Sequence, residues 1–157
     1  MPILSRIIFQ AVYWASRKGL REDPSSPASE KKLAARQAGI RAETYAYWYL
    51  RRHGYVFVAR NYMPQGAKGE IDLIGYDGKT LAFVEVRMRT VREGQSGLPE
   101  LSVGEGKRQH LLRTARRFLA SARVAESPVR FDIFAIDNRP GQPPVVRLHK
   151  DALSPQP

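Results

Sequence analysis

The chain has 157 residues, of which 43% are apolar and 26% charged, which favours a single domain with a real core over two domains. Lys and Arg number 26 against 15 Asp and Glu, so the net charge is +11 and the pI is near 10.3. This balance points to a polyanionic partner, with nucleic acid first and an anionic membrane surface second. Cysteine is absent, which excludes disulfides and thiolate metal sites and fits a cytoplasmic location. The three histidines lack ligand spacing, so zinc is not expected.

The first expected element is a helix over residues 3–16, where apolar side chains recur at helical spacing. The run is far too short for a membrane span and lacks the basic start and cleavage site of a signal peptide. We interpret it as an amphipathic helix that docks on the domain or on the second subunit of a homodimer, and we favour membrane contact less. Residues 19–29 hold two prolines and three serines, as a linker would. The expected division is helix and linker at 1–29, main domain at 30–150 and tail at 151–157.

A second helix is expected to begin after Ser29, which can cap it, and to run to residue 52. Four of its side chains fall on one continuous face: Ile40, Glu43, Tyr47 and Leu50. Glu43 is thus an acid within an apolar stripe. Two interpretations remain open at this point. Glu43 either faces the sheet as part of a site, or lies at the edge of the stripe and pairs with Arg36 or Arg41.

A β-hairpin is expected at the centre of the chain. Residues 70–75 and 80–89 alternate apolar with polar, and Asp77-Gly78 lies between them, as in a type I′ turn. With these two residues as the loop, Asp72 pairs with Phe83. Side chains opposite one another and their i±2 neighbours share a face. One face then carries Asp72, Phe83, Glu85 and Arg87, and the other carries Ile71, Leu73, Val84 and Val86.

The two acids on this hairpin are candidate metal ligands. Carboxylates about 7 to 8 Å apart on the diagonal, or closer after a register shift of two, can hold one divalent cation. Mg²⁺ is often bound by one or two carboxylates, with water and a substrate phosphate in its remaining positions. The alternative is a solvated face with an ion pair between Glu85 and Arg87. The apolar neighbours of Glu85 indicate a central strand, where acids need a partner or a metal. We expect Glu43 to converge with Asp72 and Glu85 in one cleft.

Around the hairpin we expect strands at residues 55–59, 129–136 and 145–149, and a glycine-rich loop at 92–106 that is a candidate mobile segment. A third helix is expected over residues 105–123. Its basic side chains are dense enough to follow phosphates, although a solvated helix face is the alternative. The expected nucleic-acid-binding residues are Lys107, Arg108, Gln109, Arg113, Arg116 and Arg117.

Several spaced motifs agree in order with those of one family. They are Gly39…Glu43…Tyr49-Leu50…Gly54-Tyr55, Ala59-Arg60-Asn61, Gly69-Glu70-Ile71-Asp72-Leu73-Ile74, Phe83-Val84-Glu85-Val86, Lys107-Arg108-Gln109 and Arg130-Phe131-Asp132. This pattern, over residues 37–136, resembles the bacterial YraN family, which looks like a member of the restriction-endonuclease-like superfamily, close to archaeal Holliday junction resolvases. The resemblance implies an α/β fold with a restriction-endonuclease-like core. Its central mixed β-sheet is flanked by helices in the order α-β-β-β-α-β, and the N-terminal amphipathic helix is an addition.

The resemblance also implies roles for individual residues. Asp72 and Glu85 take the positions of metal ligands for Mg²⁺ or Mn²⁺, and Glu43 that of the helical acid of the resolvase-like branch. Arg87 stands where the superfamily has lysine. Lysine can orient the attacking water or accept its proton, whereas arginine stays protonated and can only position and stabilise charge. Hydrolysis would then require the cation itself to promote ionisation of the water.

Two functions of different class follow from these residues. The first is a metal-dependent endonuclease that hydrolyses phosphodiester bonds of DNA, ahead of RNA, with branched or structured DNA expected by family analogy. The second is a nucleic-acid-binding protein on the same fold that cleaves weakly or does not cleave. A third and weaker hypothesis is a structural protein whose basic surface and first helix meet an anionic membrane.

Overall fold

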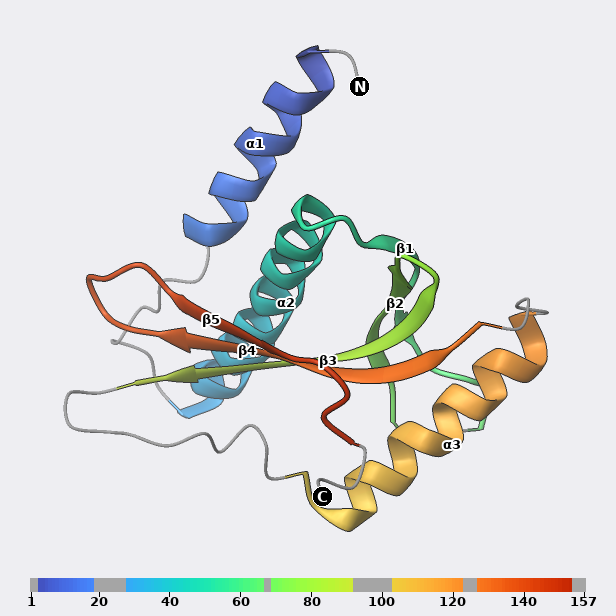
Figure 1. Cartoon of the computed structure of the whole chain (residues 1–157). Coiled ribbons are helices and arrows are strands. Elements are labelled where there is room, and N and C mark those ends of the chain that lie inside the picture. The colour runs from blue at the N-terminus through green and yellow to red at the C-terminus, as the bar shows by residue number, and fades with distance from the viewer. Residues whose placement is uncertain (1–2, 19–27, 67–68, 92–102, 123–126, 154–157) are drawn as a thin grey trace.

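The structure, a computed structural model, describes residues 3–18, 28–66, 69–91, 103–122 and 127–153 (Figure 1). In these ranges it has three helices and one five-stranded mixed sheet with strand order β1-β2-β3-β4-β5. The elements are α1 (Ile3–Lys18), α2 (Ala28–Arg52), β1 (Val56–Tyr62), β2 (Ile71–Asp77), β3 (Thr80–Thr90), α3 (Glu105–Ala122), β4 (Val129–Asn138) and β5 (Val145–His149). Every expected helix and strand is present. The expected helix cap is wrong, because α2 begins at Ala28 and so contains Ser29.

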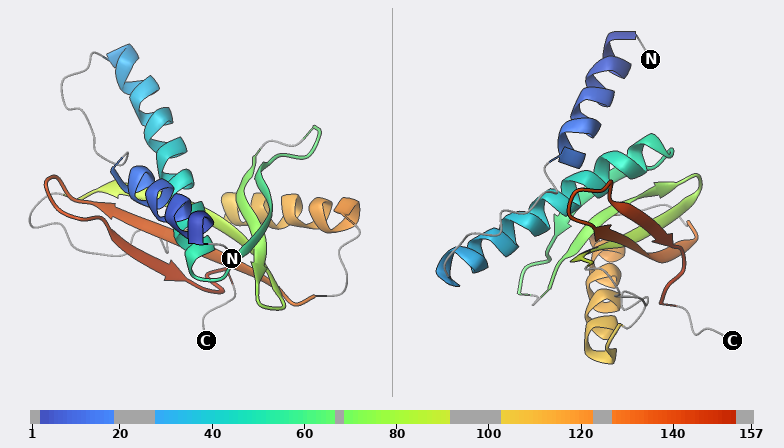
Figure 2. Two further views of the ribbon diagram at one scale, coloured as in Figure 1. Left: turned by 90° about the horizontal axis from the view of Figure 1, so that it is seen from above. Right: turned by 90° about the vertical axis from the view of Figure 1, so that its left-hand side faces the viewer.

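Helices cover both faces of the sheet, with α2 on one side and α3 on the other (Figures 1 and 2). On the α2 face, Ala42, Tyr45, Ala46 and Leu50 pack against Leu73, Ala82, Val84, Phe134 and Ile136. On the α3 face, Leu111, Ala115 and Phe118 pack against Ile71, Ile74, Leu81 and Phe83. Leu153, which follows the expected end of the main domain, is also buried in this second core. Two separate cores therefore hold one sheet between two helices.

β3 is the central strand of this arrangement. It pairs antiparallel with β2 and parallel with β4. The connection between the two parallel strands contains α3, which packs on one face of the sheet. Residues 81–85 are buried one after another, since both faces are covered. A charged side chain on this part of the strand must therefore find its partner inside the protein.

The register of the β2–β3 hairpin differs from the expected one by two residues. Asp77 still belongs to β2 and pairs with Thr80, so the loop consists of Gly78 and Lys79. Gly78 has a φ of 61°, as the first loop residue of a type II′ turn requires. The shift preserves which residues share a face, because side chains alternate with a period of two. It brings Asp72 to the level of Glu85, one step beyond the Leu73–Val84 pair.

β2 and β3 part beyond that pair. The first residues of β2 pair with β1, as in Tyr62 with Ile71, whereas β3 continues along β4 to Thr90. Figure 2 shows β1 and β2 turning away from the sheet made by β3, β4 and β5. The face expected for Ile71 is wrong, since this twisted end of β2 places it in the α3-side core and not with Leu73.

α1 packs against α2 through aromatic rings. Phe9 meets Trp48 at 5.1 Å between ring centroids, and Tyr13 stacks on Tyr45 at 5.8 Å. Tyr13 is buried, and the guanidinium of Arg52 lies over its ring. The helix thus docks on the domain itself. In the part of the chain that the structure describes, no helix is long and apolar enough to cross a membrane. Most of the expected glycine-rich loop, residues 92–102, lies outside the described residues.

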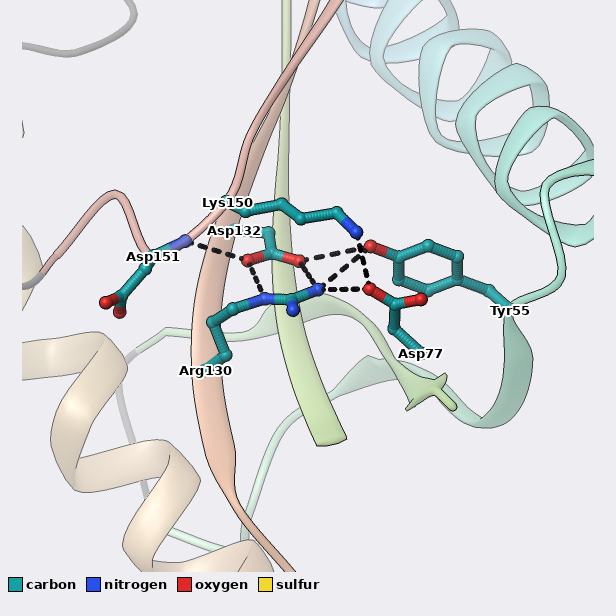
Figure 3. Close-up of polar contacts among 6 residues, drawn as sticks. All are labelled: Tyr55, Asp77, Arg130, Asp132, Lys150 and Asp151. Atoms are coloured by element: carbon teal, nitrogen blue, oxygen red, sulfur yellow. Dashed lines mark hydrogen bonds and ion pairs between the residues drawn. The ribbon is translucent and has the colours of Figure 1, made fainter. Parts of the chain in front are cut away.

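A polar network joins the ends of several elements on the α2 side (Figure 3). Arg130 binds Asp132 with Nε and Nη2 at 2.7 and 2.9 Å and reaches Asp77 at 2.7 Å. The hydroxyl of Tyr55 donates to Asp132 at 3.3 Å, and Lys150 binds Asp77 at 2.7 Å. The backbone amide of Asp151 also donates to Asp132, at 3.1 Å. The network ties β1, the hairpin, β4 and the chain after β5 together.

We expect Asp132→Asn to lower the free energy of unfolding by about 2–4 kcal/mol, because it removes the charge that compensates a mostly buried guanidinium. Urea unfolding followed by circular dichroism measures this loss. Glu70→Gln, which neutralises an exposed carboxyl, is the matched control and should change stability by less than ~0.5 kcal/mol. Equal stability of the two variants would show that the network does not hold the elements together.

Candidate functional site

Asp72 lies where β2 leaves β3. Its Oδ2 accepts a hydrogen bond of 2.7 Å from the backbone amide of Val86. The departing strand no longer supplies a carbonyl at this level, so the carboxylate takes its place as acceptor. Asp72 is only 8% exposed. The sheet therefore fixes this side chain against β3.

Glu85 points to the same side of β3 and is equally buried. Its partner is Lys107 from the first turn of α3, whose Nζ donates to Oε1 of Glu85. The alternative interpretation, a solvated hairpin face, does not describe this side chain, since it is buried and paired across the core. Lys107 was expected as a nucleic-acid-binding residue, and the structure brings it to the acids.

The electrostatics of Asp72 show that the acids act on one another. Burial raises the pKa of Asp72 from its ordinary value near 3.8 to about 7, and the nearby charge of Glu85 is the second cause. Glu43 also raises this pKa, whereas the amide of Val86 and the ammonium of Lys107 lower it. One lysine therefore does not fully compensate the negative charge gathered here.

Glu43 reaches the site from α2 and acts on the charge of Asp72. The buried stripe of α2 runs through Ala42, Tyr45, Ala46 and Leu50. The expected stripe was misaligned, because Ile40 is 53% exposed. Glu43 lies beside the buried stripe and accepts a hydrogen bond of 2.9 Å from Nδ2 of Asn61 on β1. It is thus turned towards β1 and β2 of the sheet.

A cleft of about 410 Å³ opens beside Glu85 along β3. Its charged lining residues are Glu85, Arg87, Arg89, Lys107 and Asp137. Arg89 binds Asp137 through two hydrogen bonds of 2.6 and 3.2 Å, and Arg147 binds the same carboxylate at 2.9 Å. These guanidiniums hold the pKa of Asp137 well below its usual range. The cleft therefore joins one end of the acid pair to a row of cations.

The other basic residues of α3 lie along its exposed side. Arg113, Arg116 and Arg117 are exposed, and Arg117 donates to the carbonyl of Gln65 at 3.2 Å. Gln109 donates to Glu105 one turn earlier, and Arg108 is half-buried. Arg117 follows Lys107 by ten residues, which is roughly 15 Å along the helix. These residues form an extended basic surface beside the acids, and of the six expected basic-helix residues Lys107 is the one that pairs with Glu85.

Asp72 and Glu85 suit a hard divalent cation. Both carboxylates are buried, the pKa of Asp72 is raised, and Mg²⁺ is commonly bound by one or two carboxylates together with water. Among the described residues, no group of three or more His, Cys, Asp or Glu side chains could hold a metal ion. Glu43 acts on the charge of Asp72, and its part in the site beside the two strand acids stays a prediction.

The chain is similar to a large set of bacterial proteins. The model of the uncharacterised protein family UPF0102 matches residues 42–136, more than half of the chain. The chain belongs to family UPF0102. A UPF0102 protein of Koribacter versatilis is 41% identical over 100 residues, which cover 64% of this chain and 68% of that protein. One of Geotalea uraniireducens is 36% identical over 125 residues, covering 80% and 95%. This finding confirms the YraN resemblance.

The UPF0102 match spans Glu43, both strand acids, Arg87 and α3, but leaves out α1 and β5. Three contacts of this region were missed by sequence reasoning: Lys107 with Glu85, Asn61 with Glu43, and Arg89 with Asp137. Each joins residues at least 18 positions apart. The alternation of β3 puts Arg89 on the face of Glu85 and Arg87 and could have suggested its part in the cleft.

The pKa of Asp72 predicts a dependence of stability on pH. The folded carboxyl keeps its proton to about pH 7, whereas the unfolded one loses it near pH 4, so the native state loses stability as pH rises through this window. Asp72→Asn removes the penalty and can still accept from Val86. With chelator present, we expect the variant's advantage in unfolding free energy to grow from pH 5 to pH 8 by up to roughly 2–3 kcal/mol. Urea titrations at both pH values measure it, and an advantage independent of pH would contradict the raised pKa.

Proposed function

We propose that this UPF0102 protein is a metal-dependent endonuclease that hydrolyses phosphodiester bonds in DNA. The observation that carries the proposal is the pair of buried carboxylates, Asp72 and Glu85, of which Glu85 lines a cleft together with Arg87, Arg89 and Lys107. Acids that lack positive charge attract a cation, and a row of basic side chains attracts phosphates. The combination suits a substrate that brings negative charge to a bound cation.

The order of helices and strands is compatible with this proposal. The order α2-β1-β2-β3-α3-β4, with β3 and β4 parallel, is the order expected for a restriction-endonuclease-like core. We propose that the chain has this core and that β5 and α1 are additions to it. The acids then lie on the two strands where the resemblance put the metal ligands.

In the proposed reaction a water molecule attacks phosphorus, a bridging P–O bond breaks, and the leaving oxygen gains a proton. Asp72 and Glu85 would hold Mg²⁺ or Mn²⁺, which lowers the pKa of bound water and neutralises phosphate charge. Arg87 lies two residues beyond Glu85 on the same strand face, roughly 7 Å along β3, and would hold the phosphate oxygens. Glu43, held by Asn61, contributes negative charge beside Asp72 and would help to orient water.

Branched or structured DNA is the substrate that we favour over RNA, and this preference rests on the analogy with resolvases alone. The basic surface of α3 would follow phosphates away from the acids.

The second candidate is a DNA-binding protein without cleavage. It is favoured by Arg87, because a guanidinium cannot accept the proton of water near neutral pH.

Replacing Arg87 and Asp72 separates these two functions. Arg87→Lys keeps the charge and restores a side chain that can deprotonate water, so we expect equal or faster Mg²⁺-dependent cleavage. Asp72→Asn should abolish cleavage and leave DNA binding largely intact. Single-turnover cleavage of branched and linear DNA, with affinities measured in Ca²⁺, tests both. If wild type and Arg87→Lys are both inert on every substrate, the binding function replaces the enzyme. If Asp72→Asn cleaves like wild type, the activity belongs to another site.

DNA affinity should depend steeply on salt, because log K falls by about 0.9 for each phosphate that the protein neutralises. Reversing Arg113, Arg116 and Arg117 to Glu should weaken binding to every sequence alike and flatten this dependence. Lys31, Lys32 and Arg36, exposed on the first turns of α2, provide a control triple of equal charge. Fluorescence anisotropy between 50 and 300 mM salt, on the order of the range where such effects appear, measures both. Equal losses from the two triples would show that α3 has no special role.

A further inference from the structure

In the ion pair of Lys107 with Glu85, the glutamate is buried and the lysine is half exposed. Its ammonium donates to Glu85, yet the side chain is 49% exposed, whereas that of Glu85 is 9% exposed. Glu85 belongs to the buried part of β3 and is fixed by the sheet. Lys107 extends from the first turn of α3 on a flexible four-carbon stem. The lysine can therefore leave the carboxylate by rotating its own side chain, without movement of the strand.

The charge around Glu85 favours such an exchange. Asp72 and Glu85 are both 8% exposed and close enough for their charges to interact, and Lys107 contributes one positive charge through its contact with Glu85. A divalent cation would compensate the acid pair better than one ammonium does. Lys107 occupies Oε1 of Glu85, so a cation that uses this oxygen must displace it.

The cleft provides a second position for the ammonium group of Lys107. Lys107 lines the same cleft as Arg87 and Arg89, which lie further along β3. An ammonium released from Glu85 would remain beside these guanidiniums and add to their positive charge. Without a ligand this position is unfavourable, because like charges repel. A bound phosphate would make it favourable, since lysine is a common phosphate ligand.

We propose that Lys107 is the resident counter-cation of the acid pair and that a divalent metal displaces it from Glu85 towards the phosphate in the cleft. This inference rests on the proposed metal site. Lys107 thereby changes partners during loading: it neutralises Glu85 in the empty protein and positions the phosphate in the loaded one. It is a positioning residue with a separate effect on metal affinity, which a residue that only binds nucleic acid would not have.

The test is Mn²⁺ binding without nucleic acid at pH 8, measured by calorimetry and by the electron paramagnetic resonance signal of free Mn²⁺. Lys107→Met keeps the length of the stem and removes the competing charge, so we expect it to bind Mn²⁺ about three- to tenfold more tightly than wild type. Lys107→Arg keeps the charge and should stay within about twofold of wild type. Lys79→Met removes a charge from the exposed hairpin loop, roughly 17 Å along the strands from the acids, and should also stay close to wild type.

A second measurement uses the unaltered protein and does not depend on the folding of a variant. Reductive methylation followed by mass spectrometry reports the reactivity of each lysine. Mg²⁺ should increase labelling of Lys107, because the ammonium loses its carboxylate partner, and leave labelling of Lys79 unchanged. Unchanged labelling of Lys107 at saturating Mg²⁺ would overturn the exchange.

The outcomes separate this inference from the proposed function. Mn²⁺ affinity that is unchanged or weaker in Lys107→Met overturns the exchange even if wild type cleaves DNA. Tighter binding in Lys107→Met with no cleavage by any variant supports the exchange and removes the hydrolysis. If neither wild type nor Lys107→Met binds Mn²⁺, both the exchange and the metal site are wrong.

Discussion

The burial of β3 on both faces is the constraint on which the site depends. β3 is hydrogen-bonded to strands on either side and covered by α2 and α3, so residues 81–84 are at most 1% exposed. Glu85 ends that buried run, and its charge needs a partner from inside the protein. α3 supplies one because the crossover between parallel strands brings its first turn back over the end of the strand. The position of Lys107 thus follows from the topology of the sheet.

The parting of β2 and β3 has a second consequence. A strand that leaves its neighbour exposes backbone groups that the ladder would have paired. The amide of Val86 is such a group, and the carboxylate of Asp72 accepts its hydrogen bond. The same carboxylate lies close enough to Glu85 for the two charges to interact. One side chain therefore completes the backbone hydrogen bonding of the sheet and contributes a charge to the site, which ties the shape of the fold to its electrostatics.

Sequence periodicity was sufficient for the elements and for the faces of most strand residues. The hairpin register was missed by two residues. Of the two residues expected to form the turn, Asp77 and Gly78, only Gly78 has a positive φ, so Asp77 stays in the strand. Because a shift of two residues does not change which side chains share a face, Asp72 and Glu85 were still predicted on the same face. The stripe of α2 was misplaced because Ile40 is exposed, a matter of how the helix docks on the sheet and not of its own pattern. The pairing of Lys107 with Glu85 depends on the crossing of a helix over a strand, which local spacing does not encode.

The acids of the sheet differ in how their negative charges are compensated. Asp77 and Asp137 each have two basic partners, and hydrogen bonds from those partners lower the pKa of both carboxyls. The negative charges of these two acids are compensated by their basic partners, and the ion pairs join neighbouring segments of the sheet. Asp72 lies on the same sheet, yet its pKa is raised, since burial and two further acids outweigh one amide and one lysine. Asp72 therefore differs from the acids that join strands in its electrostatics, and the proposed metal site builds on this difference.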